Sequence, residues 1–345
     1  FVYVLDRSNG KLLSAEPFTK VTWAKGYDLQ TGRPIENPEA DYSKSGKPVL
    51  LYPGMVGGHN WHPVSFSPRT GYLYFSELQF PSVYAMDSAA RFGKGSRYTS
   101  TGHDLRPMTT DMSLYAEVQR NTRGSLIAWD IARGKRAWQV EQKVPANGGT
   151  LATAGGLVFQ GATEGRLVAY ADNDGRVLWE TPIYSGVPGG PVSYEVDGRQ
   201  YLAVGVGWGG ALGTIFPGLK NPNRIAVYAL DAKGVLTPPE PLVRTFDPPP
   251  ATAPMEQVSR GLLLFAEHCG ICHGGGAGGV PDLDYMSAQT HREFAGIVLG
   301  GARESKGMPQ FREQLDAGGV QAIQDFLIWK ANQRKQAMSA PAAAH

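Results

Sequence analysis

Two different spacings of apolar residues divide the chain. In roughly the first 236 residues, short apolar runs alternate with polar positions or lie between glycines, as in Gly156–Gly161 and Gly165–Tyr170, which is typical of β-strands. From Met255 onward, apolar residues recur at intervals of three and four, which predicts α-helices. These helical positions are Val258, Leu262, Leu263, Phe265, Val320, Ile323, Phe326 and Leu327. The pattern therefore predicts a mainly β region followed by a small all-α domain.

A short pattern recurs within the β region. Residues 128–138 and residues 169–179 share Ala, Gly and Trp at the same offsets, 41 residues apart. A weaker copy opens the chain, and a clipped copy begins at Ala229. We interpret the pattern as a strand, a tight turn and a second strand, with a Trp that packs on a neighbouring sheet. About four short strands in roughly 40 residues is typical of a β-propeller blade. The alternative is a β-sandwich in which the Trp spacing arises by chance.

Residues typical of turns and linkers mark the boundaries of the predicted domains. The Asp197-Gly198 pair lies between two strand-like runs and predicts a hairpin turn. Residues 237–254 contain seven prolines, which favour an extended linker. We therefore predict a propeller portion over residues 1–236, the linker over 237–254, a helical domain over 255–335 and a flexible tail over 336–345.

Composition narrows the class of protein. The 345 residues carry 33 Lys and Arg against 31 Asp and Glu, so no nucleic-acid partner is expected. No apolar run approaches the roughly 20 residues of a membrane helix, so no membrane span is expected. The 44 glycines and 25 prolines favour many tight turns. The chain opens at Phe1 within a strand-like run, without an initiator Met or a signal peptide, and this indicates an incomplete chain.

The only two cysteines, Cys269 and Cys272, are followed directly by His273. In a Cys-x-x-Cys-His string, the two thiols add to the vinyl groups of a haem and the His binds its iron. A zinc site would need a second spaced pair of ligands, and the nearby His268 and His291 do not form one. A thioredoxin-like redox pair would need a βαβ surround, which is missing. We therefore predict covalent haem c.

A second axial ligand should follow within the helical domain. Met286 lies only 13 residues after His273, which leaves little chain to surround the porphyrin. Met308 lies 35 residues after it, between Gly307 and Pro309, in a loop suited to presenting a thioether. We favour Met308; the alternative is a Met packed in the core. Pro281 is placed where its carbonyl can accept a hydrogen bond from the His273 ring.

These features together resemble a known family. Trp-docking repeats, a Pro-rich linker and a Cys-x-x-Cys-His domain with a Lys-Gly-Met-Pro loop are similar to the quinohaemoprotein alcohol dehydrogenases, which use pyrroloquinoline quinone (PQQ) and haem c. The strings Phe1–Arg7, Gly58–Pro63, Gly148–Gly161 and Gly207–Ala211 extend the resemblance along the chain. It implies an eight-bladed propeller that binds PQQ and Ca²⁺ near its axis, of which only the later blades are present here.

The resemblance also assigns site residues. It places the catalytic Asp, the calcium ligands, a vicinal disulfide and a PQQ-contacting Lys upstream of Phe1, so no catalytic residue is assigned in this chain. Asn60, Trp61 and Ala211 match positions that contact PQQ. An amide can hydrogen-bond the quinone oxygens, and an indole offers a flat wall. Ala146 stands where the family often has Trp, which alters contact with the substrate. For Trp208, packing between blades is the favoured role.

The function implied is periplasmic oxidation of an alcohol to an aldehyde by PQQ. Electrons then pass to the haem on His273 and Met308, and on to a soluble acceptor such as a blue-copper protein or a cytochrome. The alternative is an electron-carrier cytochrome fused to a non-catalytic propeller scaffold. We expect the 345-residue chain alone to bind haem but to lack dehydrogenase activity, because part of the quinone site lies upstream.

Overall fold

The structure is a computed structural model that describes residues 1–86, 117–118, 120–142, 145, 147–207, 223–240, 246–273 and 281–339. These residues form two compact units, β-sheets up to residue 240 and helices from residue 246 onward. Across the described ranges, no helix is both long enough and apolar enough to cross a membrane.

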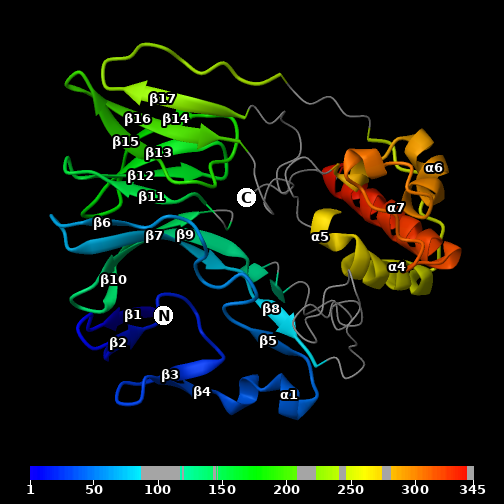
Figure 1. Ribbon diagram of the computed structural model, residues 1–345, viewed down its shortest axis with the longest axis horizontal. Coiled ribbons are helices and arrows are strands. Elements are labelled where there is room, and N and C mark those ends of the chain that lie inside the picture. The colour runs from blue at the N-terminus through cyan, green and yellow to red at the C-terminus, as the bar shows by residue number, and fades with distance from the viewer. Residues whose placement is uncertain are drawn as a thin grey trace. The chain divides into compact units, whose positions relative to one another are not determined.

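Two four-stranded antiparallel sheets form the centre of the first unit (Figure 1). The strands of each sheet lie side by side in the order in which they occur along the chain, as in a propeller blade, although residues 80–122 separate the second and third strands of the first sheet. The first sheet contains β6 (Ser65–Ser67), β7 (Tyr72–Gln79), β9 (Arg123–Asp130) and β10 (Lys135–Gln142). The second contains β11 (Thr150–Ala152), β12 (Leu157–Ala162), β13 (Arg166–Ala171) and β14 (Val177–Pro182). The recurring pattern coincides with the last two strands of each sheet.

Shorter sheets complete the first unit. Three strands form one sheet: β15 (Val192–Val196), β16 (Arg199–Val206) and β17 (Arg224–Ala229). Three strand pairs are β1 (Val2–Leu5) with β2 (Leu12–Glu16), β3 (Ala24–Asp28) with β4 (Arg33–Glu36), and β5 (Val49–Leu51) with β8 (Ser82–Tyr84). Two short helices, η1 (Pro38–Ala40) and α1 (Tyr42–Ser45), follow β4. The Asp197-Gly198 hairpin is confirmed, with φ of 50° and 75° at its two turn residues.

The tryptophans of the repeat join neighbouring sheets. Trp138 on β10 donates its indole N–H to the Asp172 carbonyl, 3.0 Å away, in the turn between β13 and β14 of the next sheet. Trp179 on β14 makes an edge-to-face contact with Tyr228 on β17, with ring centroids 5.7 Å apart. The predicted docking of each Trp on a neighbouring sheet is confirmed. Successive sheets that pack on one another in this way form part of a propeller, not a two-sheet sandwich.

The second unit is helical. Its elements are α4 (Met255–His268), α5 (Gly270–His273), η3 (Leu283–Tyr285), α6 (Ala288–Val298), η4 (Glu304–Lys306) and α7 (Ala317–Ser339). Helices α4 and α7 touch closely at Gly261, where a Cβ atom would lie 1.8 Å from the Ala322 carbonyl oxygen. Helix α7 extends past residue 335, at which the sequence places the domain end, because the Lys335–Met338 run consists of good helix formers.

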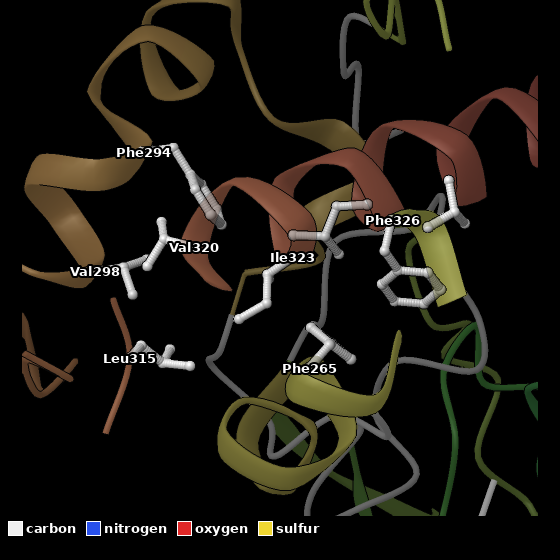
Figure 2. Close-up of a cluster of buried hydrophobic side chains, with 9 residues drawn as sticks. Phe265, Phe294, Val298, Leu315, Val320, Ile323 and Phe326 are labelled. Atoms are coloured by element: carbon white, nitrogen blue, oxygen red, sulfur yellow. The ribbon is translucent and has the colours of Figure 1, made fainter. Parts of the chain in front are cut away.

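One apolar cluster holds this unit together. Figure 2 shows side chains from α4, α6 and α7 converging with Leu315, which precedes α7. The buried members are Val258, Phe265, Phe294, Val298, Leu315, Val320, Ile323, Phe326 and Leu327. Most of these positions come from the spacing of three and four residues seen in the sequence, so the helical prediction is confirmed.

Candidate functional site

The Cys-x-x-Cys-His string lies at the junction of α4 and α5. Cys269 directly follows α4 as its C-cap, and its N–H donates to the Phe265 carbonyl at 2.9 Å. The Cys269 carbonyl then accepts hydrogen bonds from the backbone N–H groups of Cys272 and His273, at 3.1 and 2.9 Å. The tight turn therefore holds the two thiols and the imidazole within one short helical segment.

Both cysteines are free thiols. Burial raises the pKa of Cys269 to about 12, and the neighbouring Cys272 adds to the rise. Cys269 therefore stays protonated at neutral pH, unlike the low-pKa thiolate of a redox-active Cys-x-x-Cys pair. A protonated thiol at this position is compatible with thioether attachment to a haem.

The imidazole of His273 is oriented by the backbone. Its Nδ1 lies 3.1 Å from the Pro281 carbonyl oxygen. Because a carbonyl can only accept, Nδ1 donates, and this leaves the lone pair of Nε2 free to bind a metal. The acceptor role predicted for Pro281 is thus confirmed. Burial lowers the pKa of His273, and the Lys330 ammonium adds to that effect against the opposing Pro281 hydrogen bond, which favours the neutral ring.

The two candidate methionines lie in the same unit. Both Met308 and Met286 are partly buried and pack against the apolar cluster. Met308 follows η4, which ends at Gly307 with a φ of 87°, and its N–H donates to the Arg303 carbonyl at 3.3 Å. Packing is common to both methionines, and the choice of Met308 as axial ligand stays a prediction.

The described residues of the helical unit fit a haem. Partly covered apolar side chains surround the buried cluster, and such a surface suits a flat porphyrin. They include Leu262, Leu264, Leu283, Met286, Leu299, Met308, Phe311 and Trp329. Two free thiols, an imidazole with a free Nε2 and a thioether supply the attachment and ligand chemistry that haem c requires.

Two of the three predicted quinone contacts, Asn60 and Trp61, are exposed. Asn60 donates from Nδ2 to the Val56 carbonyl at 3.0 Å, and its Oδ1 accepts from the Trp61 N–H at 2.8 Å. Trp61 is 62% exposed, and its indole stacks on the His62 ring with centroids 4.5 Å apart and an interplanar angle of 19°. The structure therefore presents a supported, solvent-facing indole beside an internally bonded amide.

His62, beneath Trp61, was missed by the sequence analysis. It is 4% exposed, and neither ring nitrogen has a hydrogen-bond partner within the described ranges. Burial, with a contribution from nearby His59, lowers the pKa of His62 to about 4. His59 donates from Nδ1 to the Ser76 carbonyl at 2.7 Å. The only sequence signal was the position of His62 within the Gly58–Pro63 string.

Other predicted positions lie outside the described residues. These are Ala211, Ala146 and Trp208. In the part of the chain that the structure describes, no group of three or more His, Cys, Asp or Glu side chains is arranged to hold a metal ion.

Two protein families match the two units. Residues 25–202 match the family described as "Glucose/ethanol/alcohol dehydrogenase, beta-propeller domain", a PQQ family. Residues 256–327 match the family described as "Cytochrome C oxidase, cbb3-type, subunit III". The first match falls on the sheets and the second on the helices that carry the Cys-x-x-Cys-His string.

Similar proteins combine the same two parts. The chain is 41% identical over 339 residues to the quinohemoprotein alcohol dehydrogenase ADH IIB of Pseudomonas putida, covering 95% of this chain and 48% of that protein. It is 35% identical to the 1-butanol dehydrogenase (cytochrome c) of Thauera butanivorans, covering 96% of this chain and 48% of that protein.

Solved structures agree with these matches. The crystal structure of the quinohemoprotein alcohol dehydrogenase of Comamonas testosteroni has a TM-score of 0.79 at 34% identity, covering 96% of this chain and 49% of that one. The quinohemoprotein alcohol dehydrogenase ADHIIG of Pseudomonas putida HK5 has a TM-score of 0.83 at 34% identity, covering 97% of this chain and 50% of that one. The chain thus spans about half the length of the relatives it matches. With a PQQ-type propeller portion and a cytochrome domain in one sequence, it belongs to the PQQ-dependent quinohaemoprotein alcohol dehydrogenase family.

Proposed function

We propose that this chain takes part in the oxidation of an alcohol to an aldehyde, with PQQ as the oxidant and haem c as the outlet for electrons. The observation that carries the proposal is the His273 ring, whose Nδ1 is bonded to the Pro281 carbonyl at 3.1 Å directly after two free thiols. This arrangement shares one chain with sheets of the PQQ family. A haem-binding unit joined to such sheets supports transfer of electrons from quinone to haem.

The helical unit would hold the haem. Cys269 and Cys272 would form the thioether bonds, and His273 and Met308 would bind the iron. Bound haem c supplies a one-electron redox centre of raised potential under His and Met ligation. The chain's own contribution is to fix the ring plane of His273 through Pro281 and to cover the porphyrin with apolar side chains.

The sheet unit would supply the later rim of the quinone site. Asn60 would offer its amide to the quinone oxygens, Trp61 a flat wall, and Ala211 a small side chain near the cofactor. PQQ with Ca²⁺, when bound, supplies the hydride acceptor and the Lewis acid of alcohol oxidation. The calcium ligands and the catalytic Asp are proposed to lie upstream of Phe1. The stack of Trp61 on His62 would keep the indole plane from tilting.

The proposed setting is the periplasm, where covalent haem c and these enzymes occur. The electron acceptor would be a soluble protein such as a blue-copper protein or a cytochrome, because the haem passes electrons singly.

The proposal can be tested on the intact gene product with PQQ, Ca²⁺ and a primary alcohol. We expect the haem absorption bands to change from the ferric to the ferrous form only when all three are present. Bands that stay ferric while dithionite still reduces the haem would overturn the enzyme proposal and favour the electron-carrier alternative. The 345-residue chain alone, treated in the same way, should contain covalent haem and show no alcohol-dependent reduction.

The ligand assignment has its own test. Met308→Ala should abolish the absorption band of the sulfur-to-iron bond, whereas Met286→Ala should keep it. The two variants remove the same side chain from the same apolar cluster, so they are matched in packing. Survival of the band in Met308→Ala, with its loss in Met286→Ala, would assign Met286 instead.

A further inference from the structure

We propose that Arg334 on α7 is a positioning residue for His273. It acts by fixing the loop whose Pro281 carbonyl orients the imidazole. This inference rests on the proposed function, because it assumes that His273 binds haem iron. It concerns how the ring is held, not which ring is the ligand.

The first contact is an ion pair with a buried carboxylate. Asp284 is 5% exposed, and its Oδ2 accepts a hydrogen bond from Arg334 Nη1 at 2.8 Å. The Nζ of Lys330 lies 2.9 Å from the other carboxylate oxygen of Asp284. Lys330 and Arg334 are four residues apart, so they project from the same face of α7. Two cations from one helix face therefore hold one buried carboxylate.

The second contact reaches the residue next to Pro281. Asp282 accepts a hydrogen bond from Arg334 Nη1 through Oδ2, at 3.2 Å. Its other oxygen, Oδ1, accepts from the Asp284 N–H at 3.1 Å and so caps η3. The same carboxylate thus ties the start of η3 both to its own backbone and to α7.

The third contact is aromatic. The Arg334 guanidinium carbon lies 5.1 Å from the ring centroid of Tyr285, within the range of a cation–π interaction. Arg334 consequently contacts three of the four residues that follow Pro281. No other described cation of α7 contacts this loop at so many points.

These contacts bear on His273 through one hydrogen bond. The Pro281 carbonyl lies 3.1 Å from His273 Nδ1, and Pro281 is the residue directly before the clamped Asp282. A shift of the loop by a few tenths of an ångström changes the length and angle of this bond. Groups that orient a metal-binding His in this way are as much a part of the site as the ligand itself. Loss of Arg334 also leaves Asp284 with an incompletely compensated buried charge, which favours movement of the loop.

The chain offers a matched control on the next residue. Lys335 carries the same charge on the same helix, but its Nζ pairs with Asp247 at 3.0 Å, and the Asp247 side chain is 78% exposed. An exposed pair of this kind contributes little. Lys335→Leu therefore removes one cation from α7 without touching the η3 loop.

The experiment measures one proton in the ¹⁵N-labelled, haem-loaded chain in its reduced, diamagnetic state. The solvent exchange rate of the His273 Nδ1–H should rise about fivefold or more in Arg334→Leu, as expected for a weakened hydrogen bond. The same exchange rate should be unchanged in Lys335→Leu, and in Arg334→Lys it should stay close to that of the unmodified protein. Backbone amides of α4 and α6 serve as the reference for general loosening of the fold.

Asp282→Asn covers the case in which Arg334→Leu does not fold. The amide oxygen keeps the cap of η3, and only the charge that faces Arg334 is lost. A smaller rise of the same exchange rate is expected. An unchanged His273 rate in haem-loaded Arg334→Leu or Asp282→Asn, or an equal rise in the α4 and α6 amides, would overturn the inference. Failure of haem to attach at Cys269 and Cys272 in the unmodified chain would instead overturn the proposed function.

Discussion

Asp172 in the sheet unit and Asp284 in the helical unit are both buried, and the two carboxylates serve different parts of the structure. In the sheet unit, Asp172 is fully buried and accepts hydrogen bonds from Arg69 Nε at 3.1 Å and from the Ser67 hydroxyl at 3.3 Å. Its backbone carbonyl accepts from Trp138 and from the Tyr74 hydroxyl, at 3.0 and 2.8 Å. Three of these partners lie on strands of the neighbouring sheet, and Arg69 lies in its turn between β6 and β7. Asp172 therefore joins two sheets.

Asp284 in the helical unit joins the framework to a ligand loop instead. Its partners Lys330 and Arg334 come from α7, while its own loop carries the Pro281 carbonyl that orients His273. One buried carboxylate thus supports the packing of two sheets, and the other supports the loop that orients His273. Loss of the Asp172 contacts should lower stability without a change at the haem, whereas loss of the Asp284 contacts should change the surroundings of the haem ligand.

The largest expected effect is removal of the haem attachment in Cys269→Ala with Cys272→Ala. The partly covered apolar side chains of the helical unit would lose the porphyrin that we propose covers them. Amides of α4 and α7 should exchange with solvent about a hundredfold faster, corresponding to ~3 kcal/mol of local stability. Hydrogen exchange with mass spectrometry checks this, and amides of β12 and β13 in the same molecule are the control. Equal acceleration in both units would contradict the prediction.

The next effect concerns Asp172. Replacement by Ala removes a buried carboxylate that accepts hydrogen bonds from Ser67 and Arg69, and it should lower the free energy of unfolding of the sheets by about 3 kcal/mol. Denaturation in urea, followed by tryptophan fluorescence, measures the change, and the haem spectrum should stay as in the unmodified protein. Asp174→Ala is the control in the same turn, because its contacts are local and exposed: Arg176 Nε lies 4.0 Å from Oδ2, and the Arg176 N–H donates to Oδ1 at 3.0 Å. A smaller change of about 0.5–1 kcal/mol is expected there.

A third effect is the pH dependence of folding stability that His62 gives to the sheet unit. The pKa of His62, lowered to about 4 by burial and by His59, is below the 6.5 of an unfolded His. The unfolded chain therefore binds a proton first as the pH falls, and folding stability decreases from pH 6.5 toward pH 4. Between pH 7 and pH 5 the free energy of unfolding should decrease by about 2 kcal/mol because of His62. Urea denaturation of the unmodified protein and His62→Gln measures it, and equal pH slopes in the two proteins would refute the role of His62.

The sequence predicted the elements of both units because they depend on local patterns. The spacing of apolar residues predicted the helices from Met255 onward, and the Trp repeat predicted that Trp138 and Trp179 pack on neighbouring sheets. Even the Pro281 acceptor was predicted, because the Cys-x-x-Cys-His string fixes which ring needs one.

The buried polar contacts could not be predicted in the same way. Arg69 is 103 residues from Asp172, and Arg334 is 50 residues from Asp284. No periodicity relates such partners, since each pair is set by how whole elements pack. Asp172 looked like an ordinary turn residue, and His62 looked like one member of a string, because burial is a property of the folded chain alone.

The smallest expected difference lies between two glycines with the same backbone angle. Gly175 and Gly198 both have a φ of 75°, so an Ala at either position is strained to the same degree. At Gly175 a Cβ atom would lie 2.6 Å from the Trp138 ring, whereas nothing lies within 4 Å at Gly198. Gly175→Ala should therefore cost about 1 kcal/mol more than Gly198→Ala, from displacement of the docked indole. Urea denaturation gives both values, and the fluorescence maximum of the protein should shift to longer wavelength only in Gly175→Ala, because the displaced Trp138 ring meets more water. Equal costs would mean that the indole moves aside freely, and the contact of Trp138 would then contribute less to the sheet junction than the hydrogen bonds of Asp172.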